Sequence, residues 1–320
     1  MDFSVQQYLA HSIAPATAST YRSATTRYLR FCTQYNLPPL PLCASTVTRF
    51  AAYLADCNMV FGTIRAYLSG IRFFQILNGL PDPCLGSIPL LTYVLRGIHR
   101  LGPGTPRSPR LPITPGILRL LLETWSQAPE DSRHDSVMLW AACCTGFFGF
   151  LRAGEFTCSS WQAFNAEMLS ARDVSVDSHD RPTVVSILLR RSKTDPFGQG
   201  VTIHLGRTGL PICPVVALLA YLALRGQRPG PLFLFRDGSP LSRQRLIHHI
   251  RQVLQSRGID TTAFTGHSFR IGAATTAASM GFEDSYIQVL GRWRSTAYQR
   301  YIRSPVQALA ASSRGLLSGP

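Results

Sequence analysis

Two stretches near the end of the chain, GHSFRIGAA at 266–274 and LGRWRSTAYQRYIR at 290–303, place polar groups in an otherwise apolar helical pattern. The first puts His267 and Arg270 three residues apart at the start of a predicted helix, so both side chains project from one face. Such a pair also occurs at many ordinary capped helix starts, so its meaning depends on what accompanies it. The second stretch adds further arginines and aromatic residues, chiefly Arg292, Trp293, Tyr298 and Tyr301.

Two more polar clusters lie upstream. FFGFLRAGEF at 147–156 places Arg152 and Glu155 three residues apart directly after an apolar helix. SKTD at 192–195 places Lys193 on a predicted hairpin loop. Taken alone, the first pair is typical of a surface ion pair that contributes little to stability, and a loop lysine is normally solvated. Lys193 is, however, the single lysine among 32 basic residues, the others all being arginine.

Together these residue types suit one reaction that needs no metal. A tyrosine hydroxyl attacks a DNA phosphodiester, and arginines neutralise the charge on the phosphoryl oxygens. A histidine and a lysine handle the protons on the attacking and leaving oxygens. Tyr298 and Tyr301 lie on one face of a short predicted helix, so facing does not choose between them. The residues alone leave the choice of nucleophile between these two tyrosines open.

Composition agrees with a nucleic-acid partner. The 320 residues carry a net charge of +15 and a pI near 10.0, which favours a polyanion, with DNA or RNA ahead of an anionic membrane. No apolar run has the length of a membrane span and no leader pattern is evident, so we expect a soluble intracellular protein, nuclear if the source is eukaryotic. The eight cysteines lack metal spacing and predict reduced thiols, with neither metal nor cofactor.

The first hundred residues predict a compact, basic, all-helical module. Apolar residues recur at helical spacing over 17–35, from Ser45 or Thr46 to Leu54, and over 61–77 and 90–100. The run GPGTPRSPRLPITP at 102–115 contains five prolines, which cannot continue a helix. We therefore expect a helical DNA-binding domain at 1–104, a linker at 105–111, and a second domain with a C-terminal tail at 112–320.

The second domain mixes helices with a few short strands. Three alternating runs predict a small antiparallel sheet, and the last two are joined as a hairpin. The fold class is therefore α+β and mostly helical. The predicted strands lie at 172–176, 184–189 and 201–205, and the predicted helices at 117–125, 136–150, 214–225, 242–255, 268–280, 284–290 and 295–302.

The polar blocks, taken in order, resemble a known catalytic domain. LR-x-x-E, a hairpin lysine, GH-x-x-R-x-G-A-A and LG before a final YIR resemble the tyrosine recombinases, the family of phage-type integrases and of Cre-like and Xer-like recombinases. The first module resembles the helical core-binding (SAM-like) domain of that family, through Thr17, Tyr21, Tyr28 and Phe31. The LGRW form resembles recombinases of eukaryotic mobile elements, the DIRS-like and Crypton-like groups.

The resemblance implies roles for the matching residues. Arg152 and Arg270 would clamp the scissile phosphate, and Glu155 would orient Arg152 and the histidine. His267 would act on the attacking hydroxyl as a base or hydrogen-bond partner. Lys193 would be the general acid that protonates the 5′-oxygen leaving group.

Tyr301 would become covalently linked to the 3′-phosphate, which stores the bond energy and makes rejoining independent of ATP and metal. The implied function is site-specific DNA cleavage and rejoining in recombination or integration. The two modules would grip one DNA duplex as a clamp, with the chain forming a dimer to tetramer on it and no membrane involved. Two alternatives remain open: a catalytically idle DNA-binding protein derived from a mobile-element recombinase, and a type IB topoisomerase-like activity.

One position departs from the common pattern. Most relatives place a His or Trp directly after the glycine that precedes the nucleophile by ten residues, but here Arg292 follows Gly291 and Trp293 comes next. Strict spacing assigns that place to Arg292, whereas side-chain chemistry favours Trp293. We place Trp293 in the catalytic set and Arg292 beside it as an accessory residue. An indole donates one hydrogen bond and a guanidinium several, so either residue could contact the phosphate.

Overall fold

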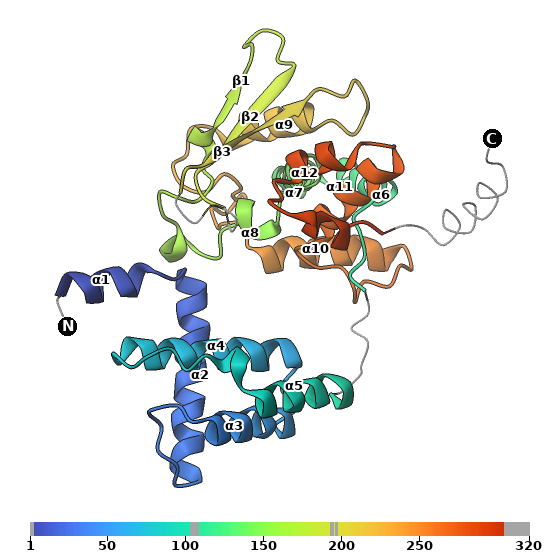
Figure 1. Cartoon of the computed structure of the whole chain (residues 1–320). Helices are drawn as coiled ribbons and strands as arrows, with labels where there is room; N and C mark the ends of the chain where they lie inside the picture. The colour runs from blue at the N-terminus through green and yellow to red at the C-terminus, as the bar shows by residue number, and fades with distance from the viewer. Residues whose placement is uncertain (1–2, 103–108, 193–194, 196–197, 304–320) are drawn as a thin grey trace, which may run out of the picture. The chain divides into compact units, whose positions relative to one another are not determined.

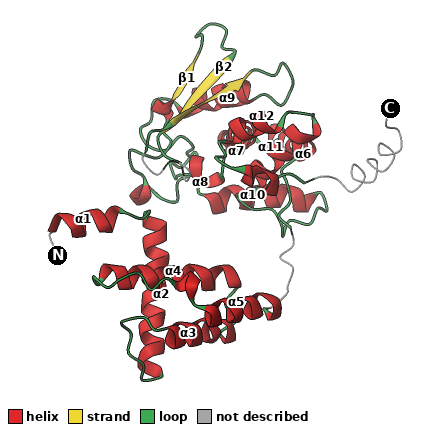
Figure 2. Cartoon of the chain, viewed as in Figure 1, coloured by secondary structure: helices red, strands yellow, loops and turns green. Residues whose placement is uncertain are grey.

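A computed structural model describes residues 3–102, 109–192, 195 and 198–303 of the chain. The chain forms two compact units, residues 1–107 and 108–320. Part of the expected linker lies outside the described residues. The predicted fold class is confirmed, because helices dominate both units and one small antiparallel sheet lies in the second (Figure 1; Figure 2).

The first unit is built from helices that pack around an aromatic core. Helix α2 (Pro15–Gln34) lies across α4 (Phe61–Leu77), and α3 (Ala44–Asp56) packs on both α4 and α5 (Pro89–Leu101) (Figure 1). Tyr28, Phe31 and Phe50 are buried, and the Phe50 ring centroid lies 5.0 and 5.3 Å from those of Tyr28 and Phe31. The sequence pattern does not predict α1, in which the side chains of Phe3, Val5 and Tyr8 are exposed. The elements are α1 (Phe3–His11), α2 (Pro15–Gln34), α3 (Ala44–Asp56), α4 (Phe61–Leu77), η1 (Leu85–Ser87) and α5 (Pro89–Leu101).

The second unit surrounds one buried helix, α7 (Glu130–Phe148), which contacts α6, α9 and α11. This helix begins at Glu130, earlier than the predicted residue 136, because acidic side chains favour the first turn of a helix. The other helical elements of the unit are α6 (Pro115–Ser126), α8 (Ala153–Phe156), η2 (Trp161–Ala163), η3 (Ala171–Asp173), α9 (Pro214–Arg225), α10 (Arg243–Ser256), α11 (Ser268–Ser279), α12 (Asp284–Gly291) and η4 (Thr296–Arg300).

The sheet has strand order β1 (Val174–Val176), β2 (Val184–Leu189) and β3 (Val201–Gly206), with both pairs antiparallel. Alternate residues of β2 are buried, and Val185 lies opposite Leu205. The start of the predicted first strand is instead η3, because Asp173 folds back to accept hydrogen bonds from the N–H and hydroxyl of Ser170, both at 2.9 Å.

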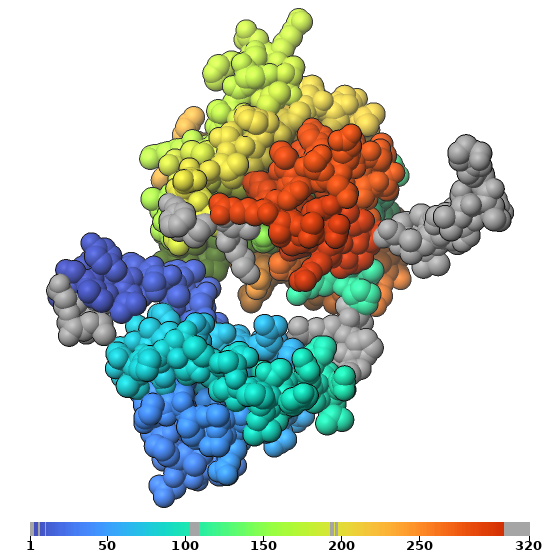
Figure 3. Space-filling model, viewed as in Figure 1, coloured from blue at the N-terminus to red at the C-terminus, as the bar shows by residue number. Residues whose placement is uncertain are grey.

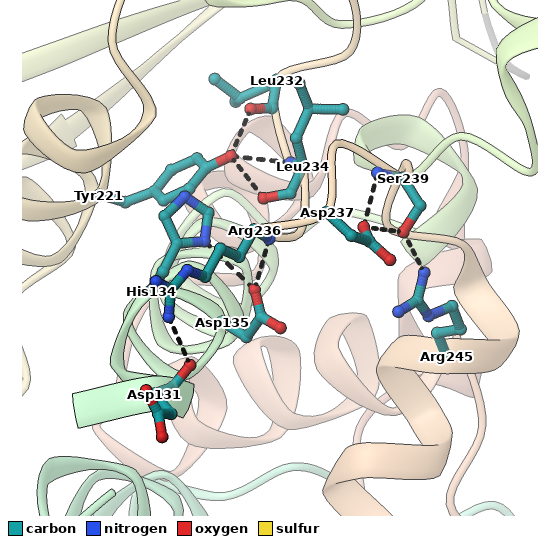
Figure 4. A network of polar contacts seen from close by, with 10 residues as sticks. All are labelled: Asp131, His134, Asp135, Tyr221, Leu232, Leu234, Arg236, Asp237, Ser239 and Arg245. Atoms are coloured by element: carbon teal, nitrogen blue, oxygen red, sulfur yellow. Dashed lines mark hydrogen bonds and ion pairs between the residues drawn. The ribbon is translucent and has the colours of Figure 1, made fainter. Parts of the chain in front are cut away.

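The loop at 231–240 forms hydrogen bonds with three helices and fixes the position of α10. Its contacts come from Asp135 of α7, Tyr221 of α9 and Arg245 of α10 (Figure 4). Asp135 and the Tyr221 hydroxyl accept hydrogen bonds from the backbone N–H groups of residues 236 and 234, both at 2.7 Å. Arg245 donates to the Ser239 hydroxyl at 2.6 Å. The N-terminal end of α10 is therefore held firmly.

The segment that enters the second unit crosses the start of α11. The Ile113 N–H donates to the Ser268 carbonyl at 2.9 Å. A Cβ atom on Gly272 would lie 1.8 Å from the Ile113 carbonyl oxygen, so this position in the GHSFRIGAA stretch requires glycine. None of the helices in the described part of the chain combines the length and apolar character needed to cross a bilayer.

Candidate active site

Glu155 anchors the site from α8. Its carboxylate accepts hydrogen bonds from the Arg152 backbone N–H at 2.9 Å and from Arg152 Nη1 at 2.8 Å. The side chains of Glu155 and Arg152 are only 7% and 17% exposed. The pair is therefore largely shielded from water, unlike a solvated surface ion pair, and the guanidinium of Arg152 is held in one place.

A backbone contact joins this segment to the histidine segment. The Ala153 N–H donates to the Gly266 carbonyl at 3.0 Å, next to Arg152 on one side and His267 on the other. His267 is half-buried and directly precedes α11. The side chain of Arg243 also packs against Gly266, since a Cβ atom there would lie 2.8 Å from Arg243 Cδ.

Arg270 is fully buried in the first turn of α11. Its Nη1 donates to the Phe150 carbonyl at 2.8 Å, and its Nη2 donates to the Gly291 carbonyl. Arg270 therefore joins the chain just before Arg152 to the end of α12. Burial, with the nearby positive charges of Arg152 and Arg292, lowers the pKa of Arg270 to about 9.

Two aromatic rings cover this guanidinium. The Arg270 Cζ atom lies 4.1 Å from the ring centroid of Trp293 and 5.7 Å from that of Tyr301, in the range of cation–π contacts. The two ring centroids are 5.3 Å apart. Trp293 is 7% exposed and lies flat against Gly291, where a Cβ atom would be 1.6 Å from the indole Cζ3. The indole can occupy this place beside Arg270 only because residue 291 is a glycine.

Arg292 ends α12 in the left-handed conformation, with φ 57° and ψ 41°. This turn directs its side chain inward, where Nη1 donates to the Gly149 carbonyl at 3.0 Å and Nη2 lies 3.4 Å from Glu155 Oε2. Its side chain is 14% exposed. Arg152 and Arg292 therefore hold opposite oxygens of the same carboxylate. Burial lowers the pKa of Arg292, and the negative charge of Glu155 opposes this shift.

The two tyrosines have different surroundings. Tyr298 is 4% exposed, and its hydrogen bond to Asp284 raises its pKa. Tyr301 is half-buried with its ring beside Arg270. Thr275 holds the backbone around Tyr301, donating to the Tyr301 carbonyl at 3.2 Å and accepting from the Arg303 N–H at 3.0 Å. The preceding segment, η4, is a 3₁₀ turn rather than the predicted helix over 295–302.

The comparisons with known proteins agree with this arrangement. Residues 182–307 match the model of the phage integrase family. The chain is 22% identical over 290 residues to an integrase/recombinase xerD homolog of Selenomonas ruminantium, covering 87% of this chain and 78% of that protein. The match to the phage integrase family model lies within the second unit, and the similarity to this relative extends over most of the chain.

Solved structures share the fold of this chain. The Tn1549 transposon integrase in complex with transposon right end DNA matches with TM-score 0.60 and 15% identity, over 98% of this chain and 99% of that one. XerH bound to difH substrate, in a pre-cleavage complex, matches with TM-score 0.59 and 15% identity, over 92% and 78%. A lambda integrase dimer bound to a COC′ core site matches with TM-score 0.55 and 13% identity, over 93% and 75%.

The fold brings most of the residues predicted from sequence into one site. Lys193 lies outside the residues that the structure describes. Thr275 and Arg243 are not singled out by any sequence pattern, because their contacts depend on the fold. In the described segments no three His, Cys, Asp or Glu residues are placed to share a metal ion. The predicted residues that meet are Arg152, Glu155, Arg270, Arg292, Trp293 and Tyr301, with His267 joined to them through the backbone.

A cleft of about 550 Å³ opens beside the candidate site, between the β2–β3 loop and the turn after α12. Arg292 and Trp293 form part of its wall, together with Ser192 and Asp195 of the loop. The segment that follows α11 forms part of the surface of the second unit (red in Figure 3). The site therefore has access to solvent on the side of Arg292.

Proposed function

We propose that this chain cleaves and rejoins DNA strands through a covalent bond between Tyr301 and a 3′-phosphate. The observation that carries the proposal is the meeting of three arginines, one tyrosine and one carboxylate from the start of α8, from α11, from the turn after α12 and from the end of η4. Three guanidinium groups against one carboxylate leave an excess of positive charge, which suits the dianionic transition state of a phosphodiester.

In the proposed reaction the Tyr301 hydroxyl attacks the phosphorus atom. The Tyr301 oxygen forms the new bond, the 5′-oxygen of the next nucleotide leaves, and the tyrosine proton passes to or through His267. Arg152 and Arg270 stabilise the charge on the phosphoryl oxygens. The partial exposure of Tyr301 supports its role over Tyr298, whose side chain is buried in the core and hydrogen-bonded to Asp284.

We assign the protonation of the leaving 5′-oxygen to Lys193, because the family resemblance places a general acid on this hairpin. A lysine suits the role since it can give up its proton, whereas arginine remains charged. Rejoining reverses the steps with a new 5′-hydroxyl, so the stored bond energy replaces ATP. Guanidinium groups carry the charge stabilisation, so we infer that cleavage needs no metal ion.

We propose duplex DNA as the partner, because the matching XerH, Tn1549 integrase and lambda integrase structures contain DNA. We further propose that two to four chains assemble on it, since the lambda integrase structure is a dimer on its core site. The first unit supports this with a groove of about 590 Å³ between α2 and its neighbours. Three arginines line that groove, Arg22, Arg27 and Arg30, together with Tyr53 and Tyr67. Guanidinium groups contact phosphates well, so this unit would serve as the core-binding domain.

The test is to trap the covalent intermediate on DNA. The protein is incubated with a pool of randomised duplexes that carry a nick, so that a short 5′-hydroxyl fragment diffuses away after cleavage and rejoining is prevented. We expect a detergent-resistant adduct with wild type and with Tyr298→Phe, also in EDTA, and none with Tyr301→Phe. Sequencing the trapped DNA gives the target.

Two outcomes would overturn the proposal. Adduct formation by Tyr301→Phe would assign the nucleophile elsewhere. DNA binding without any adduct would indicate a catalytically idle DNA-binding protein. Strand exchange between two labelled duplexes of the recovered sequence then separates recombination from supercoil relaxation alone.

A further inference from the structure

Two neighbouring residues, Arg292 and Trp293, compete for one role in the site. Both line the cleft beside it, but their side chains point to different partners. The guanidinium of Arg292 faces Glu155, and the indole of Trp293 faces Arg270. This difference decides which of the two is able to reach a bound phosphate.

Arg292 has the geometry of a phosphate ligand. Its Nη2 lies on Oε2 of Glu155 while Arg152 Nη1 lies on Oε1, at 3.4 and 2.8 Å, so one carboxylate orients both guanidinium groups. Both side chains keep some exposure, 14% and 17%. Each guanidinium has five N–H donors, so donors remain after these contacts. The left-handed backbone of Arg292, unfavourable for a residue with a Cβ atom, is what turns the side chain toward Glu155.

Trp293 has the geometry of a support. Its ring is confined between Gly291, Arg270 and Tyr301. Its indole N–H is covered by protein atoms, and no described residue accepts a hydrogen bond from it. The ring instead fixes the separation between the guanidinium of Arg270 and the phenol of Tyr301.

We propose that Arg292 is a catalytic residue that donates hydrogen bonds to a non-bridging oxygen of the scissile phosphate, and that Trp293 is a positioning residue that holds Arg270 and Tyr301. This assignment rests on the proposed function of the site. It reverses the order favoured by side-chain chemistry alone. It also gives this site a third cation where a histidine or tryptophan would supply a single hydrogen-bond donor.

The experiment compares two scissile groups in the DNA sequence recovered by trapping. One nicked duplex carries the normal phosphate and the other a methylphosphonate, in which a methyl group replaces one charged oxygen. Single-turnover adduct formation is measured for wild type, Arg292→Ala, Arg292→Lys, Trp293→Ala and Trp293→Phe. Arg257→Ala, which removes an exposed arginine at the end of α10, controls for loss of charge. Thermal unfolding verifies that each variant is folded.

On the phosphate duplex we expect Arg292→Ala to lose about 10²–10³-fold in rate, as when an oxyanion donor is removed. Arg292→Lys should lose less rate than Arg292→Ala, because lysine keeps the positive charge. It should still be slower than wild type, because an ammonium group lacks the planar set of N–H donors of a guanidinium. On the methylphosphonate duplex the ratio of the wild-type rate to the Arg292→Ala rate should be at least about tenfold smaller than on the phosphate duplex. The reason is that less negative charge needs to be stabilised in the transition state. Trp293→Ala should be slow on both duplexes by the same factor, and Trp293→Phe should recover much of the rate.

Other results would overturn the assignment. If Arg292→Ala is as active as Arg257→Ala, or if its deficit is equal on both duplexes, Arg292 does not touch the phosphate. If instead the Trp293→Ala deficit shrinks on methylphosphonate, the indole is the phosphate ligand. If Arg292→Ala does not fold, Arg292→Lys supplies the same comparison. Failure of wild type to form any adduct would reject the proposed function itself, which is a separate result.

Discussion

Gly291 shows how closely single residues determine the site. The indole of Trp293 occupies the space where a side chain at 291 would lie, with Cζ3 only 1.6 Å from a Cβ atom there. Gly291→Ala should push the ring off Arg270, so we expect a loss of about 1–3 kcal/mol in the free energy of unfolding, as for other overpacked sites. Urea unfolding measures this, and adduct formation should fall with it.

Gly154→Ala is the matched control, because a Cβ atom at 154 would have no atom within 4 Å. It should leave the free energy of unfolding nearly unchanged. If Gly291→Ala behaves in the same way as this control, the ring does not stack on Gly291 in solution.

At the scale of the elements, one buried arginine holds the C-terminal end of α9 against the loop that follows. Arg225 is 2% exposed and donates to the carbonyls of Leu232 and Pro231 at 2.8 and 2.9 Å. Removing it leaves the buried Pro231 carbonyl without its donor and the Leu232 carbonyl with only the Tyr221 hydroxyl, so we expect Arg225→Met to lower the free energy of unfolding by about 2–4 kcal/mol. Arg228→Met, at an exposed position in the following turn, is the control and should change it little. Equal effects in urea unfolding would contradict a structural role for Arg225.

The elements also show how far the sequence could predict the fold. Long amphipathic segments such as α2, α4 and α9 carry enough periodic apolar positions to predict a helix within a residue or two at each end. The segments α8 and η4 span four and five residues, too few for a periodic signal, and their ends depend on contacts that periodicity does not record.

The same reasoning applies to the candidate site. His267 and Arg270 share a short motif, so the sequence could single them out. The burial of Arg270 could not be predicted, because its carbonyl partners lie 120 residues before it and 21 residues after it. Nor does the sequence contain a signal for the pairing of Arg292 with Glu155, 137 residues away, which follows from a left-handed turn at the end of α12.

For the whole molecule, the net charge of +15 predicts how DNA binding responds to salt. A protein that neutralises several phosphates releases their counterions, so we expect affinity for the trapped duplex to fall about 10³-fold or more between 50 and 200 mM salt. The adduct-forming step at saturating protein should change far less, because Glu155 and Arg152 are largely buried and screening acts mainly on exposed charges.

In the first unit, Arg22→Gln combined with Arg30→Gln should reduce the slope of log affinity against log salt by about two, if each arginine contacts a phosphate. Arg72→Gln, which removes an arginine already paired with Asp82, is the control and should leave the slope nearly unchanged. Fluorescence anisotropy across a salt series measures these slopes, and an unaltered slope in the double variant would exclude the α2 groove from the DNA interface.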